Sequence, residues 1–384
     1  MFVSHLKVRN WRNFPRIDVD LHHRQFAVGP NASGKSNLMD VFRFLRDIAK
    51  IEGGGLQKAV ADRGGMTKIR NLSARRDPDL AIEVRFSDPM SGRETWRYEL
   101  GLKQQARGYR HTLIAHERVC RNKMVILDRP NEDDHEDILR LTQTYLEQIA
   151  ANREFRDIAR FFQTITYHHM VPALLRHTDL IRGQVLEGDP YGQYFLEKVA
   201  RETERTRKAR LSRIEQVLKV VVPRLEQLEF IRDRETGRPH LQALYAHWRP
   251  RAGIQREDQF SDGTLRLIGM LWALFEGNSL LMLEEPELFL HAGIVNRLAA
   301  LILRIQRNTG RQILISTHSA VLLSDPDIKQ EEVLLLKPIT EGTEVVASGN
   351  VKDALFFLER DVNEDQVMFE GTQTENLDQL NLFD

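Results

Sequence analysis

A glycine-rich segment near the N-terminus constrains the fold of this chain more than any other feature. It reads Gly29-Pro30-Asn31-Ala32-Ser33-Gly34-Lys35-Ser36 and matches G-x-x-x-x-G-K-[ST] without a gap. The apolar run Gln25–Val28 precedes it, and a helical periodicity from Leu38 to Ile48 follows. In this strand–loop–helix context, backbone N–H groups at the helix N-terminus can surround phosphate oxygens. The segment therefore predicts a site for the phosphates of a nucleotide.

The chemistry of this loop assigns roles to its side chains. Lys35 would neutralise the β- and γ-phosphates, and the Ser36 hydroxyl would ligate Mg²⁺. The remainder of the expected phosphate cradle consists of Asn31, Ala32, Ser33 and Gly34.

A second candidate lies where the apolar run Ser279–Leu283 ends in two carboxylates, Glu284 and Glu285. So short an apolar run is typical of a buried central strand, and α/β sheets present ligand groups at the carboxyl ends of such strands. The first carboxylate can hold Mg²⁺ and the second can polarise an attacking water. The alternative is the solvated acidic start of a helix, which also favours Glu. The phosphate loop in the same chain favours the catalytic interpretation.

A third candidate is His318, in Thr317-His318-Ser319 after an expected strand from Gln312 to Ser316. A histidine there could contact a γ-phosphate or position the water. A single histidine at a strand end more often makes a structural hydrogen bond.

Taken in this order, the phosphate loop, Glu284-Glu285-Pro286-Glu287 and Thr317-His318-Ser319 resemble the ABC-type ATPases of the RecF/SMC/OLD group. More closely, the chain is similar to bacterial AAA-type ATPases related to the OLD proteins, and this resemblance spans nearly its whole length. It implies ATP and Mg²⁺ as cofactors, Glu284 as a metal ligand, Glu285 and His318 as catalytic residues, and a homodimer that forms around ATP.

By the same resemblance, Gln259-Phe260-Ser261-Asp262-Gly263-Thr264 corresponds to the signature loop, which caps the γ-phosphate bound by the other protomer. Ser261 offers a hydroxyl, and Gly263 lets the backbone approach the phosphate. The loop is not the L-S-G-G-Q of transporters, which argues against a transporter subunit. Glu284 also stands where many relatives carry Asp. Gln57 is a weaker candidate for the glutamine that ABC-type ATPases place near the metal. His291 is a weaker candidate for a contact between protomers.

These features predict an α/β fold: an ABC-type P-loop ATPase head with a mixed or parallel sheet, an antiparallel β subdomain and an inserted helical lobe. Helical patterns run from Glu136 to Ile165 and from Tyr194 to Val222, while strand patterns between Ala81 and Asp128 indicate an antiparallel meander. The expected divisions are 1–130 and 226–358 for the two halves of the head, 131–225 for the helical lobe and 359–384 for a flexible acidic tail.

Composition narrows the class of partner. The 55 Lys and Arg residues balance 55 Asp and Glu residues, so nucleic acid could be bound only through a local patch. Arg201–Arg213 is such a basic run; it is either a solvated helix face or a contact for DNA, RNA or a partner protein. The single Cys120 excludes an internal disulfide framework, and no apolar run approaches the ~20 residues that span a bilayer. We expect a cytoplasmic protein with no membrane contact.

The last residues suggest a separate contact. Gln379–Phe383 is similar to the Q-L-x-L-F pentapeptide by which bacterial proteins bind the sliding clamp. Clamp binding is one hypothesis for this tail, and folding back of Leu380, Leu382 and Phe383 onto the domain is the other.

Three functions are compatible with these motifs. The first is an ATP-dependent switch that dimerises around two ATP molecules and acts in DNA repair or antiphage defence with a separate effector protein. The second is an ATP-regulated nuclease, which the short stretch after His318 makes less favourable because a Toprim domain needs its own α/β fold. The third is a scaffold that binds ATP without hydrolysis, and Glu285 argues against it. We expect the first, an Mg²⁺-dependent ATPase.

Overall fold

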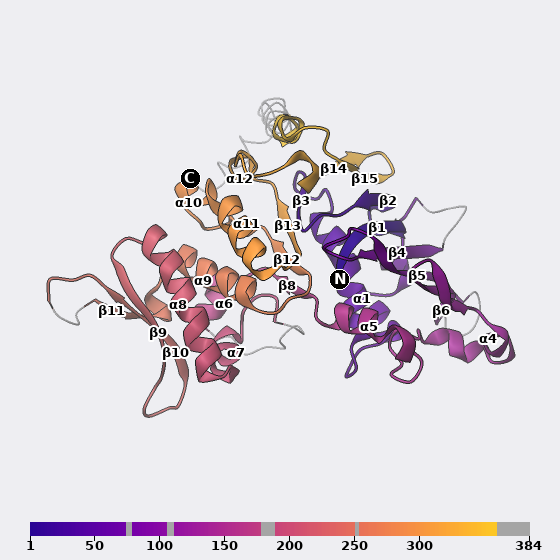
Figure 1. The fold of residues 1–384 in the computed structure, drawn as a ribbon, viewed down its shortest axis with the longest axis horizontal. Helices are drawn as coiled ribbons and strands as arrows, with labels where there is room; N and C mark the ends of the chain where they lie inside the picture. The colour runs from indigo at the N-terminus through magenta and orange to yellow at the C-terminus, as the bar shows by residue number, and fades with distance from the viewer. Residues whose placement is uncertain (74–78, 106–110, 178–188, 250–252, 359–384) are drawn as a thin grey trace, which may run out of the picture.

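The computed structural model describes residues 1–73, 79–105, 111–177, 189–249 and 253–358. Its centre is a mostly parallel sheet with the strand order β15-β14-β3-β13-β12-β8. The strands are β3 (Arg24–Val28), β8 (Thr166–His168), β12 (Leu281–Glu284), β13 (Ile313–Thr317), β14 (Val333–Ile339) and β15 (Gly342–Ala347). Only β15 among these runs antiparallel to its neighbour. In Figure 1 this sheet lies between an N-terminal half with α1, α5 and the long β-strands and a second half with α6 to α9.

The central sheet is buried on both faces, which explains why its strands are apolar without alternation. In β3, Ala27 packs in one hydrophobic cluster, whereas Phe26 and Val28 pack in the other. In β12, Met282 likewise faces the first cluster and Leu283 the second. The helix α1 (Lys35–Ala49) covers the first face, and α9 (Asp262–Phe275) and α11 (Leu298–Thr309) cover the second.

The register of the parallel strands brings three chain segments to one edge of this sheet. Val28 lies opposite Thr317, and Ser316 lies opposite Glu284. The phosphate loop, Glu285 and His318 all follow directly after these positions, so the carboxyl ends of β3, β12 and β13 meet as the sequence predicts.

The second sheet is antiparallel, with the order β2-β1-β4-β5-β6-β7. Its strands are β1 (Phe2–Trp11), β2 (Phe14–Asp20), β4 (Leu80–Ser87), β5 (Glu94–Gln104), β6 (Thr112–Arg121) and β7 (Met124–Arg129). Buried Ile82 and Val84 alternate with the partly exposed Glu83 and Arg85, as in a sheet with one face on the core. This is the predicted β subdomain. The first two strands also belong to it, so β3 is the only one of the three N-terminal strands in the parallel sheet.

The remaining elements are short helices and a three-stranded antiparallel sheet, β11-β10-β9. Its strands are β9 (Leu225–Arg232), β10 (Pro239–Tyr245) and β11 (Ile254–Arg256). The helices are α2 (Leu56–Ala61), α3 (Met66–Ile69), α4 (Glu132–Glu136), α5 (Arg156–Gln163), α6 (Pro172–Arg176), α7 (Phe195–Arg201), α8 (Glu204–Val221), α10 (Ala292–Val295) and α12 (Ala320–Leu323), with 3-10 turns at Ile138–Thr142, Arg153–Phe155, Glu257–Gln259 and Gln330–Glu332. Residues 351–358 are also helical. Among the described residues, no helix combines the length and apolar character needed to cross a bilayer.

The continuous helical pattern predicted from Glu136 to Ile165 is wrong. This segment instead forms two 3-10 turns, irregular backbone and α5. The buried Arg129 donates hydrogen bonds to the carbonyls of Arg140 and Gln143, and the Glu117 carboxylate accepts the N–H of Tyr145. Because these backbone groups bond to side chains of the β subdomain, they cannot complete a helix.

The segment expected as one helical lobe, 131–225, contributes to two cores. Phe155, Ile158 and Phe162 pack in the cluster of the antiparallel sheet, whereas Leu211 and Ile214 of α8 pack with α9. The predicted helix from Tyr194 to Val222 is interrupted before α8, where Thr203 caps the new N-terminus by accepting the N–H of Thr206. The proposed clamp-binding pentapeptide, Gln379–Phe383, lies outside the described residues.

Candidate active site

The phosphate loop connects β3 to α1 through a left-handed turn. Gly34 has φ 98°, and a Cβ added there would lie 2.2 Å from the side-chain nitrogen of Asn13. Asn13 Nδ2 donates to the Ser33 carbonyl at 3.0 Å and to Thr343 Oγ1 at 2.8 Å. Only glycine suits Gly34, because the position combines a positive φ with this close approach. Asn13 therefore holds the loop in shape, a role that no sequence motif indicated.

The polar groups of the loop are arranged to receive an anion. Lys35 is 6% exposed, and its Nζ lies 2.8 Å from the carbonyl oxygens of both Gly29 and Pro30. Ser33 Oγ is buried, and among the described residues it has no hydrogen-bond partner. A buried hydroxyl without a partner calls for a ligand or a water. These features fit the predicted phosphate site, and Asn31 and Ala32 lie in the same turn with Ala32 at φ 62°.

Ser36 and Glu284, the two residues expected on the metal side, are in contact. Ser36 Oγ donates a hydrogen bond to one oxygen of Glu284, and the hydroxyl of Tyr167 donates to the other. Burial and the neighbouring Glu284 carboxylate raise the pKa of Tyr167, so this hydroxyl stays protonated and remains a donor. The Arg43 guanidinium lies 4.5 Å from the centre of the Tyr167 ring.

A hydroxyl and a carboxylate are the oxygen ligands that Mg²⁺ prefers, and Mg²⁺ commonly takes only one or two carboxylates together with water and substrate phosphates. Ser36 and Glu284 thus fit a magnesium site. The sequence did not indicate Tyr167, because β8 reaches β12 only through the parallel pairing of Tyr167 with Met282.

The expected catalytic pair is also in contact. His318 Nδ1 lies 2.9 Å from Glu285 Oε1. Glu285 has φ 44°, a conformation that is uncommon for a residue with a side chain. Its N–H donates to the Ser316 carbonyl at 3.1 Å, so β13 holds both members of the pair. Strained backbone of this kind is concentrated at functional sites.

Arg266 of α9 fixes the backbone that carries both carboxylates. Its guanidinium donates to the Glu285 carbonyl at 2.6 Å, to the Glu284 carbonyl at 3.2 Å and to the Met170 carbonyl at 2.5 Å. The residue is 2% exposed, and burial lowers its pKa. Arg266 joins the helix that begins at Ser261 to the end of β12, and sequence reasoning passed over it.

The carboxylate after the proline has a different role. Glu287 Oε1 accepts a hydrogen bond from Thr317 Oγ1 at 2.5 Å, and burial raises the pKa of Glu287. This contact joins the loop after β12 to the end of β13 and supports the positions of Glu285 and His318.

Ser261 and Gly263 lie at the N-terminus of α9. The Ser261 hydroxyl caps the helix by accepting the N–H of Thr264 at 3.2 Å. A Cβ on Gly263 would lie 2.7 Å from the Phe289 carbonyl oxygen, so the signature loop packs closely on the loop after Glu287. Their predicted role toward a second protomer remains a prediction.

Two weaker candidates have structural partners. Gln57 Nε2 donates to the carbonyls of Thr112 and Thr142, both at 2.8 Å, which gives this side chain a role in packing α2. His291 caps α10 by accepting the N–H of Gly293 at 3.1 Å.

Most basic side chains of the predicted run Arg201–Arg213 contact aromatic rings or carboxylates of the same chain. Arg207 lies over the ring of Phe230, Arg213 over Phe275, and Arg210 both over Trp272 and in an ion pair with Glu202 at 2.7 Å. Lys208 pairs with Glu204. These contacts favour the interpretation of Arg201–Arg213 as a helix face with pairing inside the chain over a contact for nucleic acid or a partner protein.

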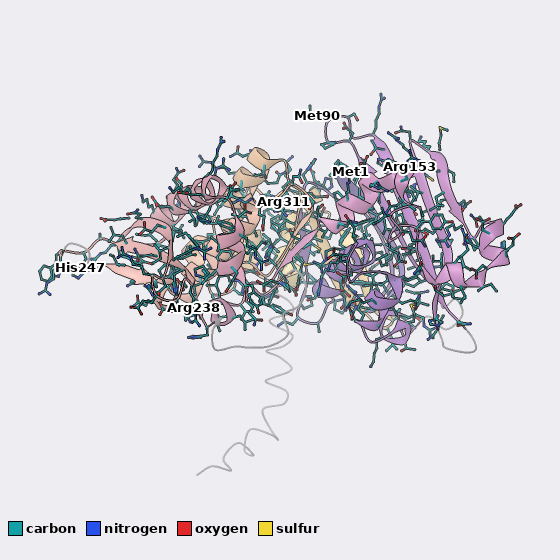
Figure 2. The ribbon with its side chains drawn as sticks, turned by 90° about the horizontal axis from the view of Figure 1, so that it is seen from below. Met1, Met90, Arg153, Arg238, His247 and Arg311 are labelled. Carbon is teal, nitrogen blue, oxygen red and sulfur yellow. The ribbon has the colours of Figure 1, made fainter. Side chains whose placement is uncertain are left out.

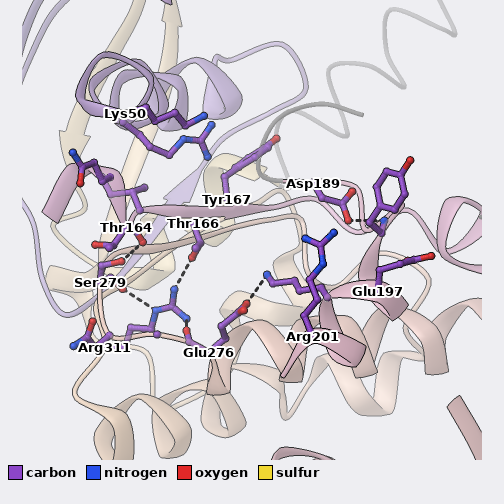
Figure 3. A pocket seen from close by; sticks show the side chains of 17 residues that line it. Lys50, Thr164, Thr166, Tyr167, Asp189, Glu197, Arg201, Glu276, Ser279 and Arg311 are labelled. Carbon is purple, nitrogen blue, oxygen red and sulfur yellow. Dashed lines mark hydrogen bonds and ion pairs between the residues drawn. The ribbon is translucent and has the colours of Figure 1, made fainter. Parts of the chain in front are cut away.

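A cavity of about 770 Å³ is lined by residues of α1, β8 and α7 (Figure 3). Arg311 in its wall donates to Thr166 Oγ1 at 2.5 Å and to the Ser279 carbonyl at 2.7 Å, and Lys198 pairs with Glu276 at 2.6 Å. These polar groups of the wall therefore bind one another. Of the residues around the metal side, Tyr167 reaches this cavity.

The fold defines the class: the chain has the fold of an ABC/SMC-like P-loop ATPase domain. The sequence profile of the family described as "AAA domain, putative AbiEii toxin, Type IV TA system" matches residues 28–324. The chain belongs to this family.

Solved structures of SMC heads share the fold. The SmcHead bound to the C-winged helix domain of ScpA is similar with a TM-score of 0.56 and 14% identity, over 92% of this chain and 100% of that chain. The SMC head domain from Thermotoga maritima gives 0.50 and 13%, over 91% and 100%. The Smc head domain with a coiled coil and joint from Pyrococcus yayanosii gives 0.51 and 11%, over 94% and 99%. No curated protein matches the sequence. The predicted fold class is confirmed.

Proposed function

We propose that this protein binds and hydrolyses ATP with Mg²⁺ and acts as a molecular switch that dimerises around two ATP molecules. The observation that carries the proposal is the meeting of Ser36, Glu284, Glu285 and His318 at one edge of the central sheet, beside the phosphate loop. Mg²⁺ bound there would neutralise charge on the phosphate oxygens.

In the proposed reaction, Glu285 acts as the general base. One oxygen of its carboxylate takes a proton from the attacking water, and His318 Nδ1 at 2.9 Å from Oε1 holds that carboxylate in orientation. Lys35 and the loop N–H groups bind the phosphates, and Ser36 and Glu284 hold the metal side. Tyr167 keeps Glu284 in place through its hydrogen bond.

In the proposed dimer, the N-terminal end of α9 contacts the nucleotide bound by the partner. Ser261 and Gly263 would cap the γ-phosphate held by the partner, and Arg266 in the same helix binds the carbonyls of Glu284 and Glu285. Closure of the dimer could in this way set the geometry of the base. One solved SMC head is bound to a domain of ScpA, which supports an effector protein in trans for this chain as well.

The proposal places the switch in DNA repair or antiphage defence, in the cytoplasm, with a separate effector. A scaffold without hydrolysis is less favoured because Glu285 and His318 form a preorganised pair.

Replacement of Glu285 by Gln tests the reaction. It keeps the size of the side chain and removes the base, so we expect ATP binding to persist while turnover falls by ~10²-fold or more. Turnover equal to that of the unmodified protein would assign the base to another residue.

A further inference from the structure

The chain carries four tryptophans, and one of them differs sharply from the rest in exposure. Trp11, Trp96 and Trp272 are 0%, 7% and 1% exposed, whereas Trp248 is 78% exposed. Trp248 follows β10 at one extremity of the molecule, where Figure 2 labels its neighbour His247. An indole has a large apolar face and a polar N–H, and tryptophan is enriched at binding interfaces for this reason.

The rings and cations around Trp248 are already ordered. The His247 ring stacks on Trp248 with centroids 5.6 Å apart and an interplanar angle of 26°, and the Arg249 guanidinium lies 4.4 Å from the centre of the indole. The Arg249 N–H also donates to His247 Nδ1 at 3.0 Å. The His247 ring, the Trp248 indole and the Arg249 guanidinium thus form one stacked group that carries the charge of Arg249.

Two further exposed residues adjoin this group. The Ala246 N–H donates to the Arg224 carbonyl at 2.7 Å, which brings Arg224 beside the loop. Ile254, 42% exposed, pairs with Leu244 in the β10–β11 ladder. We call Arg224, His247, Trp248, Arg249 and Ile254 the tip surface.

The charge of the tip surface indicates the chemical class of its ligand. From Pro239 to Arg256 the sequence has three arginines, two histidines and no acidic residue. The cations at the other end of β10 have acidic partners: His240 pairs with Glu257, and Arg256 with Asp233. Glu226, two residues after Arg224, is the nearest acidic residue along that strand. An aromatic group with Arg224 and Arg249 beside it matches a ligand that has both flat apolar faces and negative charge.

We propose that the tip surface binds single-stranded nucleic acid, with a base stacked on the Trp248 group and phosphates beside Arg224 and Arg249. Stacking on aromatic rings with arginine support is the general mode for such strands, and unpaired bases are the ones that offer free faces. A bilayer surface is a poorer match, because Ile254 is the only other apolar residue of the tip surface and membrane-binding helices bury a broad apolar face.

Trp248 itself reports on this binding, because it is the exposed tryptophan. Titration of the full-length protein with oligo(dT) at low salt should quench the exposed indole component of the fluorescence, in a saturable and salt-sensitive manner. With fluorescein-labelled oligo(dT), Trp248→Ala should raise the Kd about tenfold or more, whereas Trp248→Phe should keep much of the affinity. A duplex of the same length should bind more weakly, since its bases are not free.

The matched control is Met90→Ala, because Met90 is 94% exposed and lies between β4 and β5, far from His247 in Figure 2. Equal affinity of Trp248→Ala and the control for oligo(dT) would overturn the proposal. So would equal quenching by duplex and single strand. Partition of Trp248 into anionic phospholipid vesicles without any response to oligo(dT) would also overturn it and assign the surface to membranes.

Discussion

Replacement of Arg266 by Met tests whether α9 positions the catalytic carboxylates. Methionine has a similar length but no donor, so the carbonyls of Glu284 and Glu285 lose the guanidinium at 3.2 and 2.6 Å. A hydrogen bond to a charged group contributes about 1.5–3 kcal/mol. Loss of two such bonds at the strained Glu285 backbone removes about 3 kcal/mol or more from the arrangement that hydrolysis requires.

About 1.4 kcal/mol corresponds to a factor of ten in rate, so we expect kcat to fall by roughly 10²-fold. The affinity for ATP should change little, because the phosphate loop lies on another element. Lysine at this position keeps the charge but not the fork of donors, and Arg266→Lys should lose less activity than Arg266→Met. Steady-state ATPase assays, with fluorescent-nucleotide binding and a thermal melt for each variant, separate these effects.

Arg311 provides the matched control. Like Arg266, Arg311 is buried and donates to backbone carbonyls, those of Ser279 and Ala273. Ser279 precedes β12, so this contact lies at the end of β12 opposite to Glu284. Arg311→Met should lower the Tm while leaving kcat of the folded protein nearly unchanged. The reasoning is refuted if folded Arg266→Met keeps the original kcat, or if Arg311→Met loses as much of kcat as Arg266→Met does.

Three other substitutions test two parts of the site and one buried ion pair at α1. Lys35→Ala should abolish nucleotide binding in a fluorescent-nucleotide titration, and unchanged affinity would contradict the loop assignment. Ser261→Ala should impair the ATP-induced dimer in light scattering without loss of nucleotide binding, and an unaffected dimer would remove the signature loop from the interface. Asp40→Asn removes the carboxylate that pairs with the buried Arg63 at 2.9 Å, while Asp47 still pairs with Arg63, and it should lower the free energy of unfolding by about 1.5–3 kcal/mol in urea titrations; a change near zero would contradict this. Burial alone would raise the pKa of Asp40, but Arg63 and Arg12 lower it overall, so its stabilisation is present above the unfolded pKa of about 4 and is lost as pH falls through the lower folded value.

The sequence could predict those parts of the site that depend only on position directly after an apolar strand. The phosphate loop lies between an apolar strand and a helix, and Glu285 and His318 each end an apolar run. Because parallel strands place their carboxyl ends at one edge, local position was enough to predict that these residues meet. Their catalytic roles remain predictions.

Other parts depend on tertiary contacts that have no local signal. Tyr167 reaches Glu284 only because β8 pairs with β12, and Asn13 reaches the phosphate loop from the turn between β1 and β2. In the sequence, Arg266 is a polar residue in a mostly apolar helical segment, and nothing local indicates its contacts with Glu284 and Glu285. The helical prediction over Glu136–Ile165 failed for a related reason, since buried side chains of the β subdomain bind that backbone.

The proposed switch depends above all on a dimer that forms around ATP. The most direct measurement is the solution mass of the Glu285→Gln variant by light scattering, with and without ATP and Mg²⁺. We predict the mass of a single 44.6 kDa chain without nucleotide and about twice that mass with it. A mass that stays at one chain in saturating ATP and Mg²⁺ would contradict the account.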